Sequence, residues 1–238
     1  MNIPNTLTVF RVVLVPVFVY FLLKPDPISR IIALGVFFLA SISDFFDGYL
    51  ARKWNQESAF GRFLDPLADK ALVISSIFAF VYLDQLIPLW MVLVIIGRDM
   101  LITALRFLAI RKGMEVKTSK LGKAKTAFQM ISIVIIVVVF IVRSYRVDIT
   151  RTFEEGRNEG RKNISIAIDS FSEGIRILPD KQISTSRKIR VFAESIPYFV
   201  MLLTTWVTII SGIRYIYTNY RILAPPYYVF RARPGEQK

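Results

Sequence analysis

Four aspartates in the first third of the chain have the types and spacing needed for chemistry. Asp44 and Asp47 are three residues apart, and Asp65 and Asp69 are four apart. On a helix, residues at these spacings lie on one face. Carboxylate oxygens are hard ligands suited to Mg²⁺ or Mn²⁺, and without a cation four of them would repel one another. The spacing therefore predicts a metal site where two helical faces meet.

The residues interleaved with these aspartates suit a nucleotide diphosphate. Gly48 and Gly61 have no Cβ, so a ligand can approach the helix closely, and Ala51 is nearly as small. Arg52 offers a planar fork of donors for phosphate oxygens. Ion pairing, for example between Asp44 and Arg52, is the structural alternative. It is disfavoured because each charge placed inside a membrane costs about 2.5–3.5 kcal/mol.

The remainder of the chain predicts the scaffold that holds these residues. Hydrophobic residues make up 54% of the 238, and they occur in long runs. Six runs approach the roughly 20 residues that cross a bilayer. They are Leu7–Leu23, Ile31–Leu50, Leu64–Leu83, Ile87–Ile110, Ala124–Val142 and Ile196–Tyr217. The sequence thus predicts an all-α integral membrane protein with six transmembrane helices.

Composition also narrows the chemistry. There are no cysteines and no histidines, which excludes disulfides, thiol catalysis and an imidazole base. The net charge of +13 fits anionic lipid headgroups, anionic substrates and basic loops, and we expect no nucleic-acid partner in so apolar a chain.

Loop charge predicts the orientation. The connections at 51–62 and 111–123 are basic, which places them, and the aspartates, at the cytoplasmic face. Residues 143–194 then form a polar extracytoplasmic insert between the fifth and sixth spans, for which we expect one or two surface helices. The predicted organisation is catalytic helices over 1–142, the insert, and a last span with a basic cytoplasmic tail over 195–238.

The aspartate stretch resembles a known signature. It reads Asp44-x-x-Asp47-Gly48-x-x-Ala51-Arg52, followed by Gly61-x-x-x-Asp65-x-x-x-Asp69, and matches every fixed position of the CDP-alcohol phosphotransferase family. The resemblance implies attack by an alcohol on the β-phosphorus of a CDP-activated lipid, with release of CMP. It also implies two Mg²⁺ or Mn²⁺ ions and a homodimer.

The same resemblance implies roles for individual residues. The metal ligands would be Asp44, Asp47, Asp65 and Asp69, and Asp69 would also be the general base that deprotonates the acceptor. The CDP-lipid would be bound by Gly48, Ala51, Arg52, Ser58 and Gly61.

A second set of residues bears on the acceptor. Arg98-Asp99, Ala104-Leu105-Arg106 and the stretch Ser119–Thr126 are similar to bacterial members of the family that join CDP-diacylglycerol to glycerol 3-phosphate, with Asp99 in place of a glutamate. The resemblance implies a protein of the bacterial cytoplasmic (inner) membrane. A phosphorylated acceptor needs a cationic pocket. The predicted phosphate-binding residues are Arg106, Lys123, Lys125 and Thr126.

Several alternatives remain open on sequence grounds. Each of these basic residues could simply flank a membrane span on its positive side. Arg98 lies inside a predicted span, and its partner could be Asp99, an aspartate of the motif or the substrate phosphate. The acceptor could instead be inositol phosphate or phosphatidylglycerol. A protein of another class, a non-catalytic cation carrier, would use the aspartates for ion passage.

Overall fold

The structure is a computed structural model that describes residues 3–54, 59–111, 120–145, 161–180 and 182–220. These residues form helices joined by short connections, with no strand among them. The helices are α1 (Ile3–Leu23), α2 (Pro27–Trp54), α3 (Ala59–Leu83), α4 (Leu89–Arg111), α5 (Lys120–Ser144), α7 (Asn163–Ile177) and α8 (Thr185–Thr218). The predicted all-α class is confirmed.

Each of the six predicted spans coincides with a helix, but most helices are longer than the apolar run. α2 and α3 continue through the aspartate motif to Trp54 and from Ala59. α8 begins at Thr185, eleven residues before the predicted span, so the boundary drawn at 194 falls inside a continuous helix. Its first turns remain helical because Val191, Ala193 and Ser195 are buried by packing. Apolar runs therefore locate helices better than they locate helix ends.

The start of α2 shows how the short connections are built. Asp26 precedes Pro27, and its Oδ2 accepts a hydrogen bond of 2.7 Å from the backbone N–H of Ser29. This is an N-cap followed by proline at the first helical position, where the missing N–H costs nothing. The same hydrogen bond lowers the pKa of the Asp26 carboxyl.

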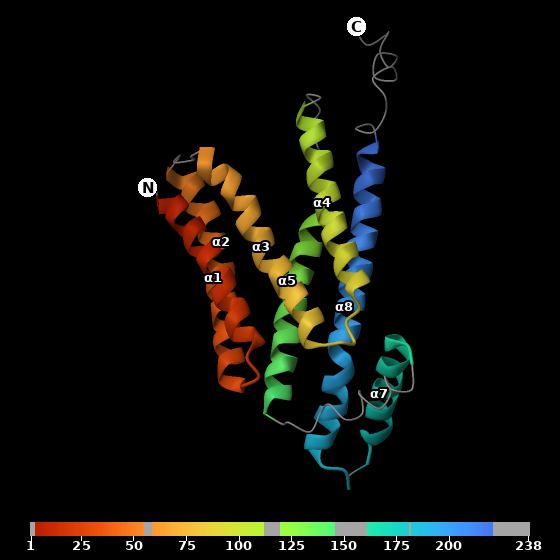
Figure 1. The fold of residues 1–238 in the computed structure, drawn as a ribbon. Coiled ribbons are helices and arrows are strands. Elements are labelled where there is room, and N and C mark those ends of the chain that lie inside the picture. Colours follow the sequence, from red (N-terminus) through yellow and green to blue (C-terminus); the bar gives the residue numbers. More distant parts are fainter. Residues whose placement is uncertain (1–2, 55–58, 112–119, 146–160, 181, 221–238) are drawn as a thin grey trace.

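The helices pack in two connected groups (Figure 1). α1 lies against α2 and α3, while α8 lies against α4, α5 and α7, and α2 contacts α5. One buried apolar cluster runs through both groups. Aromatic pairs join its helices: the ring centroids of Phe18 and Phe37 are 5.8 Å apart, and those of Phe80 and Phe140 are 5.6 Å apart.

The outer surface of these helices is apolar, as expected of a membrane protein. Among the described residues, two helices are long and apolar enough to cross a bilayer, over Ala124–Ser144 and Arg187–Thr218. Large apolar side chains are also exposed along the other helices, for example Val13, Leu39 and Leu93. A soluble monomer rarely exposes apolar surface on this scale.

A cluster of polar contacts fastens the turn between α3 and α4 to α5, α7 and α8. Arg143 pairs with Asp84 at 2.8 Å and also donates to the carbonyl oxygens of Ala193 and Glu194. The Asn163 side-chain amide, at the start of α7, donates to the carbonyl oxygens of Gln85 and Leu86. We call Asp84, Arg143 and Asn163 the turn clamp.

Candidate active site

The aspartate motif lies on the facing ends of two consecutive helices. Asp44 and Asp47 belong to the C-terminal part of α2, and Asp65 and Asp69 to the N-terminal part of α3. These two ends lie at the same end of the molecule (Figure 1). The predicted helical spacing of each pair is therefore present in the backbone.

The side chains of this motif fall outside the described part of the structure. This holds for all four aspartates and for Gly48, Ala51, Arg52 and Gly61, whereas Ser58 lies wholly outside the described residues. Among the side chains that are described, no group of three or more Asp, Glu, His or Cys could hold a metal ion. The predicted metal and CDP-lipid ligands therefore stay predictions.

The donor set nevertheless fits a divalent cation. Four carboxylates from two helices supply only oxygen ligands, which suits Mg²⁺ and Mn²⁺ and disfavours softer metals. The chain offers no histidine or cysteine that would recruit another metal.

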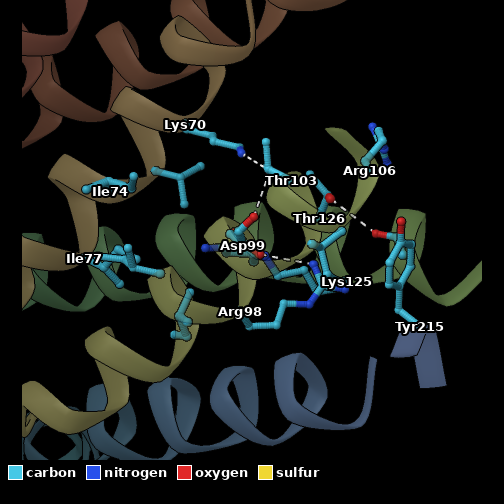
Figure 2. Close-up of a pocket in the computed structure, with 16 residues that line it drawn as sticks. Lys70, Ile74, Ile77, Arg98, Asp99, Thr103, Arg106, Lys125, Thr126 and Tyr215 are labelled. Carbon is cyan, nitrogen blue, oxygen red and sulfur yellow. Dashed lines mark hydrogen bonds and ion pairs between the residues drawn. The ribbon is translucent and has the colours of Figure 1, made fainter. Parts of the chain in front are cut away.

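Directly beyond the motif on α3 lies a cavity of ≈ 370 Å³. Its wall is made by α3, α4, α5 and α8, and it begins at Lys70, the residue after Asp69 (Figure 2). The polar lining residues are Lys70, Arg98, Asp99, Thr103, Arg106, Lys125, Thr126, Gln129 and Tyr215. Four of these side chains are cationic and one is a carboxylate, so the cavity suits an anion.

One carboxylate organises the cations on the cavity wall. Asp99 accepts hydrogen bonds from Lys125 Nζ, 2.7 Å from each carboxylate oxygen, and from Arg98 at 3.1 Å. Lys125 is only 4% exposed, so this ion pair is largely shielded from water. Arg98 also donates to the hydroxyl of Ser211 on α8. Of the three partners proposed for Arg98 from the sequence, the structure shows Asp99.

A hydrogen bond connects the aspartate helix to this wall. Lys70 Nζ on α3 donates to Thr103 Oγ1 on α4, and Thr103 Oγ1 donates to the carbonyl oxygen of Asp99 at 2.8 Å. Figure 2 shows Lys70 reaching across to Thr103 from the α3 side. The residue next to Asp69 is thus fixed to the helix that carries Arg98 and Arg106.

The structure brings together three of the four residues predicted to bind the acceptor phosphate. Arg106, Lys125 and Thr126 line the cavity from α4 and α5. The side chain of Lys123 lies outside the described residues. Arg106 is exposed, whereas Lys125 is buried against Asp99, so the two cations have different surroundings. Both line one cavity from two helices, but their binding of an acceptor phosphate stays a prediction.

Sequence reasoning missed Gln129 and Tyr215. Both line the cavity and are at least 96% buried, and Gln129 Nε2 and Tyr215 Oη have no hydrogen-bond partner. Gln129 lies one helical turn beyond Lys125, a spacing that could have indicated it. Nothing in the sequence indicated Tyr215, because α8 is distant along the chain.

Close packing between α4 and α8 sets the position of Arg98. A Cβ added to Gly212 would lie 3.0 Å from Arg98 Cγ. Glycine therefore allows the Arg98 side chain to lie against α8 and reach Ser211.

The described helices, the aspartates placed on two adjoining ones and the cationic cavity beside them suit a protein that binds phosphate-bearing substrates. Residues 1–152 match the model of the CDP-alcohol phosphatidyltransferase family. The chain belongs to this family. The aspartate motif, and both helices that carry it, α2 and α3, lie within the matched part.

Three curated relatives within this family share one name. The chain is 40% identical over 144 residues to the CDP-diacylglycerol–glycerol-3-phosphate 3-phosphatidyltransferase of Bacillus subtilis, covering 56% of this chain and 74% of that protein. It is 41% identical over 138 residues to the protein of the same name from Escherichia coli, covering 56% and 74%. The protein of that name from Cereibacter sphaeroides is 42% identical over 139 residues, covering 57% and 62%.

Proposed function

We propose that this protein transfers the phosphatidyl group of CDP-diacylglycerol to sn-glycerol 3-phosphate, giving phosphatidylglycerol phosphate and CMP. Family membership and the names of the relatives support the reaction. The assignment of the acceptor rests on the cavity that begins next to Asp69, because Arg106 and Lys125 line it from two helices. A phosphate dianion is the ligand that such donors recognise.

In this reaction an acceptor hydroxyl oxygen forms a bond to the β-phosphorus. The bridging P–O bond of the diphosphate breaks, CMP departs with the bridging oxygen, and the proton of the hydroxyl passes to Asp69. Two divalent cations, Mg²⁺ or Mn²⁺, would be held by Asp44, Asp47, Asp65 and Asp69, and would supply neutralisation of the diphosphate charge.

The remaining residues of the motif bind and orient the lipid. Arg52 offers two parallel donors to phosphate oxygens. Gly48, Ala51 and Gly61 leave room for the nucleotide at the helix surface, and Ser58 adds a hydroxyl. Arg106, Lys123, Lys125 and Thr126 hold the acceptor phosphate, and so orient its hydroxyl toward Asp69.

We further propose that the six helices α1–α5 and α8 span a bacterial inner membrane, with the aspartates at the cytoplasmic face and α7 in an extracytoplasmic insert. The basic stretches at 51–62, within the motif, and at 111–123, between α4 and α5, support this orientation. Glycerol 3-phosphate would then enter from the cytoplasm while the lipid tails stay in the bilayer. A homodimer is the expected assembly.

The test is CMP release by the purified protein with CDP-diacylglycerol, Mg²⁺ or Mn²⁺, and a panel of acceptors. We expect release with glycerol 3-phosphate and much less with inositol phosphate or phosphatidylglycerol. No CMP with any acceptor would exclude the enzyme and favour a cation carrier. Release with only one of the other acceptors would show that the assignment of glycerol 3-phosphate as acceptor is wrong.

A further inference from the structure

Two uncharged polar side chains, Tyr215 of α8 and Gln129 of α5, line the cavity. Tyr215 Oη and Gln129 Nε2 have no hydrogen-bond partner, although both side chains are more than nine-tenths buried and both line the cavity. A buried polar group without a partner costs free energy, and native proteins rarely leave one. Two such groups on the wall of one cavity are placed to take part in binding a ligand.

Packing holds the ring of Tyr215 in place at the wall of the cavity. Its ring forms a small buried cluster with Ile102 and Leu105 of α4. Figure 2 shows its hydroxyl end directed toward the part of the cavity where Arg106 and Thr126 lie. The ring is thus fixed by apolar contacts, and the hydroxyl is not needed to hold the helices together.

The cations and the uncharged donors suit different parts of one ligand. Arg106 and Lys125 provide charge for a phosphate. A tyrosine hydroxyl can donate and accept, and an amide nitrogen donates, which matches an alcohol that has to be recognised without being ionised. Glycerol 3-phosphate has one hydroxyl that reacts and a second, at carbon 2, that does not.

We propose that Tyr215, assisted by Gln129, binds the unreactive hydroxyl of the phosphorylated polyol acceptor and so selects the acceptor. The proposal rests on the proposed transferase function and deepens it. It places a specificity residue on α8, outside residues 1–152 that match the family model. Since α8 also supplies Ser211 and Gly212 to the Arg98 side chain, the last helix shapes the acceptor cavity at three positions.

The test compares two acceptors in two proteins. The wild type and Tyr215→Phe are assayed for CMP release with glycerol 3-phosphate and with 3-hydroxypropyl phosphate, which lacks only the carbon-2 hydroxyl. We expect the wild type to favour glycerol 3-phosphate in kcat/KM by about tenfold, since a single buried hydrogen bond is at stake. Tyr215→Phe should reduce that preference to within about twofold, mainly through the KM for glycerol 3-phosphate.

Controls separate selection from general damage. Tyr217→Phe removes a hydroxyl two residues away on α8, where the side chain is 80% exposed, and should leave the preference unchanged. Gln129→Leu should lower the preference in the same direction as Tyr215→Phe. The KM for CDP-diacylglycerol should not change in any of these variants.

Two results would overturn the inference, and they are distinguishable. If the wild type uses glycerol 3-phosphate but Tyr215→Phe keeps the full preference, Tyr215 does not select the acceptor, while the transferase function stands. If the wild type releases no CMP with either acceptor, the proposed function fails and the inference fails with it.

Discussion

The turn clamp and the cavity each pair an aspartate with an arginine, but they satisfy these charges differently. In the turn clamp, Arg143 donates to Asp84 and to two backbone carbonyl oxygens. In the cavity, Asp99 pairs with Arg98 and Lys125, yet Arg98 Nε stays without a partner. The arginine of the first cluster has a partner for each of its nitrogens, whereas the arginine of the second cluster has one nitrogen without a partner.

We interpret the turn clamp as a cluster that stabilises the fold, and the cluster around Asp99 as part of a ligand site. A closed cluster ties together elements distant in sequence, here the turn after α3, α5 and α8. The second cluster lies beside a cavity whose exposed Arg106 can meet a substrate phosphate. Variants at the two places should therefore affect different measurements, stability at the turn clamp and turnover or KM at the cavity.

The largest expected effect contrasts two aspartates of α3 and its following turn. Asp69→Asn should lower kcat by about 1,000-fold, because it removes the proposed base and a metal ligand, while binding of CDP-diacylglycerol persists. Asp84→Asn, the matched control, should keep kcat per folded molecule and lower the melting temperature. CMP release and thermal unfolding in detergent measure the two effects. A wild-type rate for Asp69→Asn would refute its role as the base.

Breaking the turn clamp from its cationic side should cost stability. Arg143→Met leaves Asp84, only 6% exposed, without its cation, so we expect a loss of about 3–5 kcal/mol in unfolding free energy. Adding Asp84→Asn to Arg143→Met should recover part of this loss, because the uncompensated charge is gone. Loss of activity at an unchanged melting temperature would show that the turn clamp serves catalysis.

An intermediate effect is expected at the exposed cation of the cavity. Arg106→Gln should raise the KM for glycerol 3-phosphate by about 10- to 100-fold, the range for a hydrogen bond to a charged group, with the KM for CDP-diacylglycerol unchanged. Arg111→Gln is the control, since Arg111 lies on the same helix but packs over the ring of Phe107. Equal rises in both KM values would indicate that Arg106 sets topology and does not contact the acceptor.

The smallest effect tests the packing behind Arg98. Gly212→Ala introduces a Cβ 3.0 Å from Arg98 Cγ and should shift that side chain, reducing kcat/KM for the acceptor by about fivefold. Gly97→Ala, where a Cβ meets nothing within 4 Å, should be neutral. Steady-state kinetics on both variants decide the point. Identical kinetics would mean that Arg98 yields without consequence.

Local pattern accounts for what the sequence predicted. Long apolar runs located all six helices of the predicted spans, and α7 lies within residues 143–194, where one or two surface helices were expected. Similarity to the family grouped Arg106, Lys123, Lys125 and Thr126, and three of these four residues line one cavity. The helices follow from local apolar runs, whereas the grouping of the cations rested on the resemblance to the family.

Contacts between distant helices account for what the sequence did not predict. Tyr215 reaches the cavity only because α8 packs against α4, and Ser211 becomes a partner of Arg98 for the same reason. Likewise, nothing local in Arg143 reveals that it binds Asp84, 59 residues away. The early start of α8 depends on tertiary packing too, since its first turns are polar in sequence.

The central claim is that the cavity recognises a phosphorylated acceptor, and the most direct test compares glycerol 3-phosphate with glycerol. CMP release from CDP-diacylglycerol is measured with each acceptor for the wild type and for Arg106→Gln. We expect the wild type to prefer glycerol 3-phosphate by at least about 100-fold in kcat/KM, and Arg106→Gln to lose most of that preference. Equal rates of the wild type with both acceptors would contradict the account.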